Sequence, residues 1–160
     1  MKLNIIEGDA TRPQDDGRMI VAHVCNDHGA WGKGFVVAVS RRWPQAEWAY
    51  RQWFRDRDRN DFGLGAVLLV DVGPGLWVAS MVAQHGMAVG KAVRGDPPIR
   101  YSERCLRTVA AHAFALDASV HMPRIGCGLA GGRWELVGPM IDGTLGIMGI
   151  PVTVYDPLPL

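Results

Sequence analysis

Cysteine, long apolar runs and excess charge are all scarce in this 160-residue sequence. Its three cysteines have no paired spacing, which argues against a disulfide-stapled fold. Glycine, proline, histidine or charge interrupts every apolar run before it reaches the roughly 18 residues that span a bilayer. The N-terminal Met1 to Asn4 lacks the apolar core of a signal peptide. We therefore expect a reduced, cytoplasmic protein with no membrane partner.

The charge balance is close to neutral, with 17 Lys and Arg residues against 16 Asp and Glu residues and a net charge of +1. Binding to bare duplex DNA or to an anionic membrane by bulk electrostatics is therefore not expected. Residues 51–61 alternate in sign, which favours a solvated surface over a nucleic-acid patch. Any anionic ligand must be held locally. The length suits one domain, so we expect a single, monomeric unit over residues 1–160.

Six β-branched, apolar runs predict strands, and glycine-rich or helical segments separate them. Most of these runs are continuously apolar, which is typical of strands covered on both faces. The sequence Gly73-Pro74-Gly75 between the third and fourth runs predicts a hairpin, and so one antiparallel pair. The expected strands are residues 3–7, 19–24, 66–72, 76–83, 119–124 and 151–155.

Four helices are expected between these strands. The first covers residues 34–42, and the second starts with Pro44 at its first position. Ser102 is expected to cap the third helix, and residues 134–148 form the fourth, weakened by Gly138, Gly143 and Gly146. The apolar face of the third helix is expected to contain Cys105, Leu106, Val109, Ala110, Ala113 and Phe114. The predicted class is α/β, a mixed sheet with helices on both faces.

Two glycine-rich loops follow predicted strands and lead into predicted helices. The first runs from His23 to Phe35 and the second from Ile125 to Trp134. Glycine lets successive amides turn inward, and a helix N-terminus adds partial positive charge, so each loop could hold a phosphate without a lysine or arginine. Neither loop is a P-loop or a GxGxxG turn at the first strand. The alternative is that both loops only turn the chain tightly.

Four segments together resemble the macrodomain family along residues 3–156. They are Gly8-Asp9-Ala10-Thr11, Asn26 with Gly29 to Gly34, Pro123 to Leu129, and Val154-Tyr155-Asp156. The resemblance is nearest to the branch of the terminal ADP-ribose protein glycohydrolase, and the first loop is also similar to that of ADP-ribose 1″-phosphate phosphatases. It implies a three-layer α/β/α fold with a mixed, mostly parallel six-stranded sheet, and a cleft that binds ADP-ribose.

The resemblance also implies a role for individual residues. Asp9 would accept from the adenine amino group, with the Ala10 amide nearby, although Asp9 also suits a helix cap or turn. Asn26 would read the distal ribose hydroxyls. The residues that would line the rest of the ADP-ribose site are Gly32, Lys33, Gly34 and Phe35 in the first loop, Ile125, Gly126, Cys127, Gly128, Leu129 and Ala130 in the second, and Tyr155 and Asp156 beside the adenosine.

The catalytic pattern of that glycohydrolase, a lysine and an aspartate, is not matched. The lysine position falls on His85, or on Gln84 if the register slips by one, and the aspartate position is Ala130. A Schiff base needs a primary amine, and the nearest lysine, Lys91, has no defined place. We expect His85 to act as a general base and Asn26 to orient the ribose. A structural histidine at a strand end is the alternative for His85.

Two further sets of residues have a structural interpretation. His23 and Cys25 form a His-x-Cys pair that favours core packing over zinc binding, and no metal or cofactor is expected. Cys127 has no adjacent base, so it is not expected to be a nucleophile.

Three functions therefore stay open. They are an enzyme that removes ADP-ribose from acidic side chains of proteins, an ADP-ribose 1″-phosphate phosphatase, and a reader of ADP-ribose without activity. The expected partners are ADP-ribose and ADP-ribosylated proteins, and ADP-ribosylated nucleic acid is a further candidate.

Overall fold

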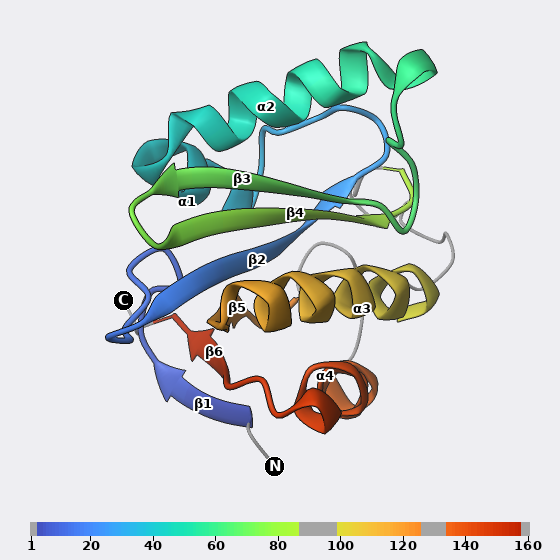
Figure 1. Cartoon of the computed structure of the whole chain (residues 1–160). Helices are drawn as coiled ribbons and strands as arrows, with labels where there is room; N and C mark the ends of the chain where they lie inside the picture. Colours follow the sequence, from blue (N-terminus) through green and yellow to red (C-terminus); the bar gives the residue numbers. More distant parts are fainter. Residues whose placement is uncertain (1–2, 87–98, 126–133, 158–160) are drawn as a thin grey trace.

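A computed structural model of the chain describes residues 3–86, 99–125 and 134–157. Its centre is a six-stranded sheet in the order β1-β6-β5-β2-β4-β3, in which only β3 runs antiparallel, to β4 (Figure 1). The strands are β1 (Leu3–Glu7), β2 (Arg18–Asn26), β3 (Val67–Gly73), β4 (Leu76–Gln84), β5 (Ala118–Pro123) and β6 (Val152–Asp156). The mixed, mostly parallel sheet and the Gly73 hairpin are as expected.

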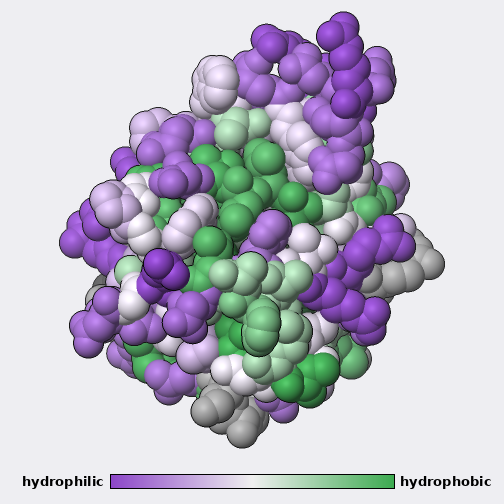
Figure 2. Space-filling view, viewed as in Figure 1, coloured by the Kyte–Doolittle hydropathy of each residue, from purple (hydrophilic) through white to green (hydrophobic). Residues whose placement is uncertain are grey.

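Helices cover both faces of the sheet and make three layers (Figure 1). The helices α1 (Phe35–Arg42) and α2 (Pro44–Arg55) lie on one face, and α3 (Ile99–Leu116) and α4 (Trp134–Thr144) lie on the other. Two short 3-10 helices, η1 (Arg57–Arg59) and η2 (Gly146–Met148), follow α2 and α4. Figure 2 shows polar residues around the end of α2, where residues 55–61 are exposed.

Strand β2 lies between β4 and β5 and contributes to both halves of the core. Ile20 and Ala22 pack in the cluster that contains α3 and α4, whereas Val21 and Cys25 pack in the cluster that contains α1 and α2. This alternation explains why the strand is apolar without a break, since a parallel strand buried on both faces has no solvent side.

The third helix differs from expectation at its start and on its apolar face. It begins at Ile99, directly after Pro98, and Ser102 is 2% exposed inside it, so Ser102 is not a cap. Prolines are well tolerated before and in a first helical turn, and they were the better signal for the start. Phe114 is 70% exposed. At about 100° per residue it lies roughly 110° from the centre of the buried stripe, which explains its exposure.

The fourth helix is shorter than predicted. It ends at Thr144, and the rest of the predicted span becomes the 3-10 turn η2. Gly149 closes that turn at a φ of 73°, a conformation that favours glycine. The glycines that weaken this segment therefore end the α-helix one turn early.

His23 and Cys25 are core residues, as their spacing indicated. They are 1% and 3% exposed. The Nε2 atom of His23 lies 2.9 Å from Oγ of Ser80, and its ring meets Trp31 edge-on at 5.2 Å between centroids. Burial lowers the pKa of His23 to about 3 and raises that of the Cys25 thiol.

Among the described residues, no helix combines the length and the apolar character that crossing a membrane requires.

The buried His23 makes stability dependent on pH. The unfolded chain takes up a proton at this histidine near its ordinary pKa of 6.5, whereas the folded chain does so only near 3. The free energy of unfolding therefore falls as the pH falls from 7 to 5. In urea titrations we expect His23→Gln to lose about 2 kcal/mol less than the wild type over this range. His28→Gln, which removes an exposed histidine, should lose as much as the wild type, and equal losses in all three proteins would contradict the prediction.

Candidate ligand-binding site

Five parallel strands end at the same edge of the sheet. Their last residues are Glu7, Asn26, Gln84, Pro123 and Asp156. In open α/β sheets this edge is where ligands bind, because the loops that lead into helices converge there. Two cavities of about 420 Å³ each lie there.

The first cavity, called here the Tyr155 cavity, is mostly apolar. Its lining consists of Gly8, Asp9, Ala10, Phe35, Ala38, Pro123, Tyr155 and Pro157. Tyr155 is 2% exposed, and the position of a Cβ on Gly8 would be 3.2 Å from its ring. The backbone after β1 thus lies directly against the aromatic ring. A flat, apolar group is the kind of ligand that such a lining suits.

Asp9 is a turn residue that also lines the Tyr155 cavity. Its Oδ1 accepts hydrogen bonds from the amide and the hydroxyl of Thr11, at 2.8 and 2.7 Å, and its carbonyl accepts one from the Arg12 amide. These bonds make it a turn residue. Its Oδ2 lies 4.0 Å from Nε of Arg12, and the residue is exposed at the cavity. The turn therefore fixes the direction of a carboxylate that lines the cavity.

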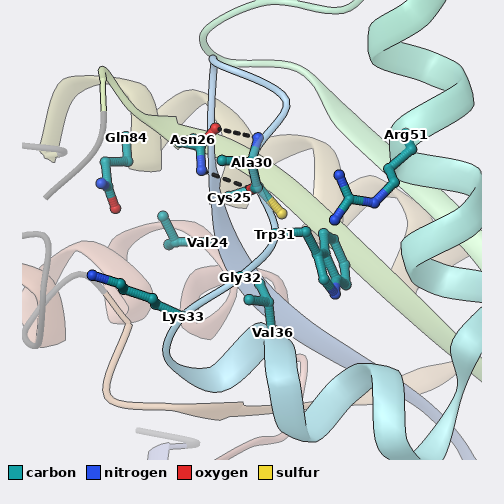
Figure 3. Close-up of a pocket in the computed structure, with 10 residues that line it drawn as sticks. All are labelled: Val24, Cys25, Asn26, Ala30, Trp31, Gly32, Lys33, Val36, Arg51 and Gln84. Carbon is teal, nitrogen blue, oxygen red and sulfur yellow. Dashed lines mark hydrogen bonds between the residues drawn. The ribbon is translucent and has the colours of Figure 1, made fainter.

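The second cavity, called here the Asn26 cavity, is more polar (Figure 3). Its lining consists of Val24, Cys25, Asn26, Ala30, Trp31, Gly32, Lys33, Val36, Arg51 and Gln84. Lys33 and Gln84 lie on one side of the loop after β2, and Trp31 and Arg51 lie on the other (Figure 3). Phe35 and Val36 are consecutive but line different cavities, so the first turn of α1 lies between the two spaces.

The side chain of Asn26 closes its own loop. Its Nδ2 donates to the carbonyl of Ala30 at 2.8 Å, and its Oδ1 accepts from the amide of Ala30 at 3.2 Å (Figure 3). The same Oδ1 accepts from the amide of His28 at 2.8 Å. One hydrogen of Nδ2 is used in this way, so the other is the group through which Asn26 could meet a ribose hydroxyl. Holding the loop in shape is the role that its contacts show.

Helix α2 packs against this loop and bonds to it. Tyr50 is fully buried and donates its hydroxyl to the carbonyl of Asn26 at 2.7 Å, and its ring lies 5.1 Å from that of Trp31. Gly29 has a φ of 77°, and a Cβ there would lie 2.4 Å from the ring of Phe54. Both features mean that the loop is packed against α2 without space for a larger residue at Gly29.

Gly34 is the N-cap of α1 with a φ of 81°. The helix that follows it has eight residues, and the carbonyl of Gly34 accepts from the amide of Val37. The partial positive charge of a helix N-terminus favours anions there. Because this turn separates the two cavities, a linker that joins two ligand halves would pass over the helix end.

Two cations line the Asn26 cavity, and no carboxylate does so among its described lining residues. Lys33 reaches toward Gln84 in Figure 3. Arg51 forms a 2.8 Å ion pair with Glu47 and also donates to the carbonyl of Gly29 at 3.4 Å. Lys33 is therefore the cation better placed to meet an anionic ligand.

The end of β4 presents Gln84, not His85, to the Asn26 cavity. Gln84 pairs with Asn26 because the pairing of β2 with β4 skips Ala83 of β4, and Gln84 is the alternative position that counting from the hairpin gave. His85 lies beside the cavity residues, with Nδ1 2.8 Å from Oδ2 of Asp27. Burial alone would raise the pKa of Asp27, but hydrogen bonds from the Gly86 amide and from His85 hold it below its usual range.

The carboxylate of Asp156 is engaged by Arg124. Arg124 donates through Nε at 2.5 Å and through a second nitrogen at 3.0 Å, and its guanidinium lies 4.8 Å from the centre of the Trp134 ring. These bonds from Arg124 lower the pKa of Asp156. Arg124 thus joins Asp156 at the end of β6 to Trp134 at the start of α4. Asp156 is not among the described residues that line the Tyr155 cavity.

The second loop lies largely outside the described residues. Ile125 is described and is 3% exposed. The predicted contacts of Gly126, Cys127, Gly128, Leu129 and Ala130, and the position of Lys91, fall in the segments that the structure does not describe.

Three contributors to the site were missed by sequence reasoning. Asp27 meets His85 across 58 positions, Arg124 meets Asp156 across 32, and Tyr50 meets Asn26 across 24. Asp27 follows Asn26 and Arg124 precedes Ile125, and both of these neighbours were predicted site residues. That adjacency was the only local indication of a role for Asp27 and Arg124. Tyr50 had none beyond its place on the apolar face of α2.

Comparisons with known proteins relate this chain to others by sequence and by fold. No protein-family model matches the chain. Among curated proteins, the ADP-ribose 1″-phosphate phosphatase of Lodderomyces elongisporus is 25% identical, over 89% of this chain and 92% of that protein. The mouse (Mus musculus) chromodomain-helicase-DNA-binding protein 1-like is 30% identical over 96% of this chain. The chain spans only 17% of the length of that mouse protein.

One solved structure shares more of its sequence with this chain than these two proteins do. The macrodomain protein of Streptomyces coelicolor is 56% identical to this chain, with a TM-score of 0.85. The match covers 96% of this chain and 98% of that protein. With more than half of the residues identical along nearly the whole length of both chains, and with the same fold, this chain belongs to the macrodomain family.

Proposed function

We propose that this chain binds ADP-ribose and hydrolyses the ester that links ADP-ribose to acidic side chains of proteins. The observation that carries the proposal is the pair of cavities on either side of the first turn of α1. One is apolar and aromatic with a carboxylate at its edge, and the other is polar with Asn26, Lys33 and Gln84. ADP-ribose matches this order, since a flat adenine at one end is joined through a charged diphosphate to a polar ribose at the other.

The binding mode follows from these surfaces. The adenine would lie in the Tyr155 cavity with its amino group near Asp9, and the diphosphate would cross the N-terminus of α1 at Gly34. The distal ribose would enter the Asn26 cavity. The name of the phosphatase relative, which refers to an ADP-ribose 1″-phosphate, supports the same ligand class.

The pair of Asp27 and His85 supplies a general base for hydrolysis. A carboxylate can only accept, so the bond between Asp27 and Nδ1 places the proton of a neutral imidazole on Nδ1. Nε2 then has the lone pair, which is the arrangement that a base requires. The side chain of His85 is 59% exposed at the edge of the sheet, where solvent can reach it.

The reaction needs one water and no covalent intermediate. The water oxygen forms a bond with C1″ as the bond from C1″ to the ester oxygen breaks, and the protein side chain leaves as a carboxylate. The proton of the water passes to Nε2 of His85. Because a carboxylate is a good leaving group, no acid is needed on that side, and one base would contribute about 10²–10⁴-fold.

A phosphatase acting on ADP-ribose 1″-phosphate is the second candidate. The match to a phosphatase over most of both chains favours it, as does Lys33 in the Asn26 cavity, where a terminal phosphate would lie. The ester hydrolase is preferred because the described lining of that cavity has no carboxylate or cysteine with a lowered pKa to act as a nucleophile on phosphorus.

Binding should depend on the helix end between the cavities. We expect isothermal titration to detect ADP-ribose binding by the wild type and at least a 100-fold loss in Gly34→Glu, because a carboxylate there repels the diphosphate and a non-glycine residue is strained at a φ of 81°. Gly73→Glu adds the same charge at the hairpin, where the position of a Cβ meets no atom within 4 Å. It should bind as the wild type does. Equal affinity in Gly34→Glu would remove the helix end from the site.

Turnover should depend on the Asp27 and His85 pair. In a release assay on an auto-ADP-ribosylated protein, we expect His85→Ala to keep its affinity for ADP-ribose and to lose about 10²–10⁴-fold in rate. Asp27→Asn should also be slowed, because its one amide oxygen cannot accept from both the Gly86 amide and Nδ1 of His85. His112→Ala, on α3 away from the cavities, should be unaffected. An unchanged rate in His85→Ala would move catalysis to Asn26 or to a bound water.

Three substrates separate the candidate functions. The ester hydrolase should release ADP-ribose from the modified protein and little inorganic phosphate from ADP-ribose 1″-phosphate. The reverse pattern would establish the phosphatase. Binding without either product would leave a reader of ADP-ribose, and release from ADP-ribosylated nucleic acid would extend the substrate class.

A further inference from the structure

A buried chain of hydrogen bonds joins Ser119 and His121 of β5 to Tyr155 of the neighbouring strand β6. The hydroxyl of Tyr155 lies 2.7 Å from Nδ1 of His121, and Nε2 of His121 lies 2.7 Å from Oγ of Ser119. These three side chains are 2%, 1% and 7% exposed. Neither His121 nor Ser119 is among the described residues that line the Tyr155 cavity or the Asn26 cavity, so neither would touch a ligand bound there.

The acceptor beside Ser119 gives the chain its direction. The hydroxyl of Ser119 donates to the carbonyl of Arg18, at 3.4 Å. The oxygen of Ser119 therefore accepts from Nε2 of His121. Burial keeps His121 neutral by lowering its pKa to about 4, so Nδ1 is an acceptor and Tyr155 donates to it.

The segment between β1 and β2 is joined to the same chain. The amide of Gln14 donates to the hydroxyl of Tyr155 at 3.0 Å. This segment starts with Gly8 and Asp9, which line the Tyr155 cavity. The amide of Gly8 also donates to the carbonyl of Asp156 at 2.7 Å, next to Tyr155. The segment that carries Asp9 is thus held to β6 at two points, at Gly8 through the backbone and at Gln14 through the phenolic oxygen.

We propose that His121 is a positioning residue that sets the base selectivity of the Tyr155 cavity by holding the Tyr155 hydroxyl and, through it, the segment with Asp9. The inference rests on the proposed function, in which that cavity takes adenine. Discrimination between an amino group and a keto group on the purine depends on where the Asp9 carboxylate lies. Loss of the chain should therefore reduce selectivity more than it reduces affinity for the rest of the ligand.

The test compares ADP-ribose with its hypoxanthine analogue, which differs only in the base. In isothermal titration we expect the wild type to prefer ADP-ribose by about tenfold or more, the factor that one well-formed hydrogen bond supports. His121→Phe, which fills the space without a hydrogen bond, should reduce the preference to below about threefold. His121→Gln can still accept and donate, and it should recover most of the preference.

A double-mutant cycle shows whether His121 acts through the tyrosine. Tyr155→Phe keeps the ring and removes the hydroxyl, and it should lose selectivity as His121→Phe does. The double variant should lose no more than either one, because both break the same bond. Full additivity would overturn the proposal. Tyr155→Phe also keeps the test available where His121→Phe does not fold.

Thr144→Val is the matched control. It removes a buried hydroxyl that bonds to the carbonyl of Met140 in α4, on the other side of the sheet. It should lower the melting temperature and leave the selectivity unchanged. Unchanged selectivity in both His121→Phe and Tyr155→Phe would overturn the inference, whereas absence of ADP-ribose binding by the wild type would instead overturn the proposed function.

Discussion

The parallel pairing of β2 with both of its neighbours is the constraint from which the rest of the molecule follows. Because β4 and β5 flank it in the same direction, Asn26, Gln84 and the end of β5 reach one edge together. Because both faces of β2 are buried, helices must cover each side. The two cavities lie at that edge, between the strand ends and the loops that follow them.

A binding surface made from backbone needs a rigid support, and α2 provides it. The loop after β2 exposes few side chains of its own, so its amides can serve a ligand only if the chain keeps its shape. Tyr50 bonds to the loop, Trp31 packs on Tyr50, and Phe54 lies under Gly29. A chain with a net charge of +1 can present a local positive region in this way, which a count of charged residues does not reveal.

The strands could be predicted because burial on both faces leaves a continuous apolar signal. Helix ends were less predictable. The start of α3 depends on prolines that compete with a serine cap, and the end of α4 depends on glycines that a 3-10 turn also accepts. Within the site, Asp9, Gly32, Lys33, Phe35 and Tyr155 line the two cavities, and their contacts with ADP-ribose stay predictions.

The partners of those residues were not predictable from one sequence. A slip of one residue reverses the side on which a strand residue lies, so counting from the hairpin could not decide between Gln84 and His85. The pairing of Asp156 with Arg124 arises because parallel β5 and β6 bring Tyr155 opposite Pro123. No local pattern contains that register.

The position of Phe35 and Val36 on opposite sides of one helical turn has a consequence for competition inside a cell. If the cavities take the two halves of one ligand, as the proposed function has it, a mononucleotide would fill only one of them. Once the first half of a linked ligand is bound, the second would meet its cavity at an effective concentration of the order of millimolar. Two subsites would then favour a two-headed molecule over abundant single nucleotides.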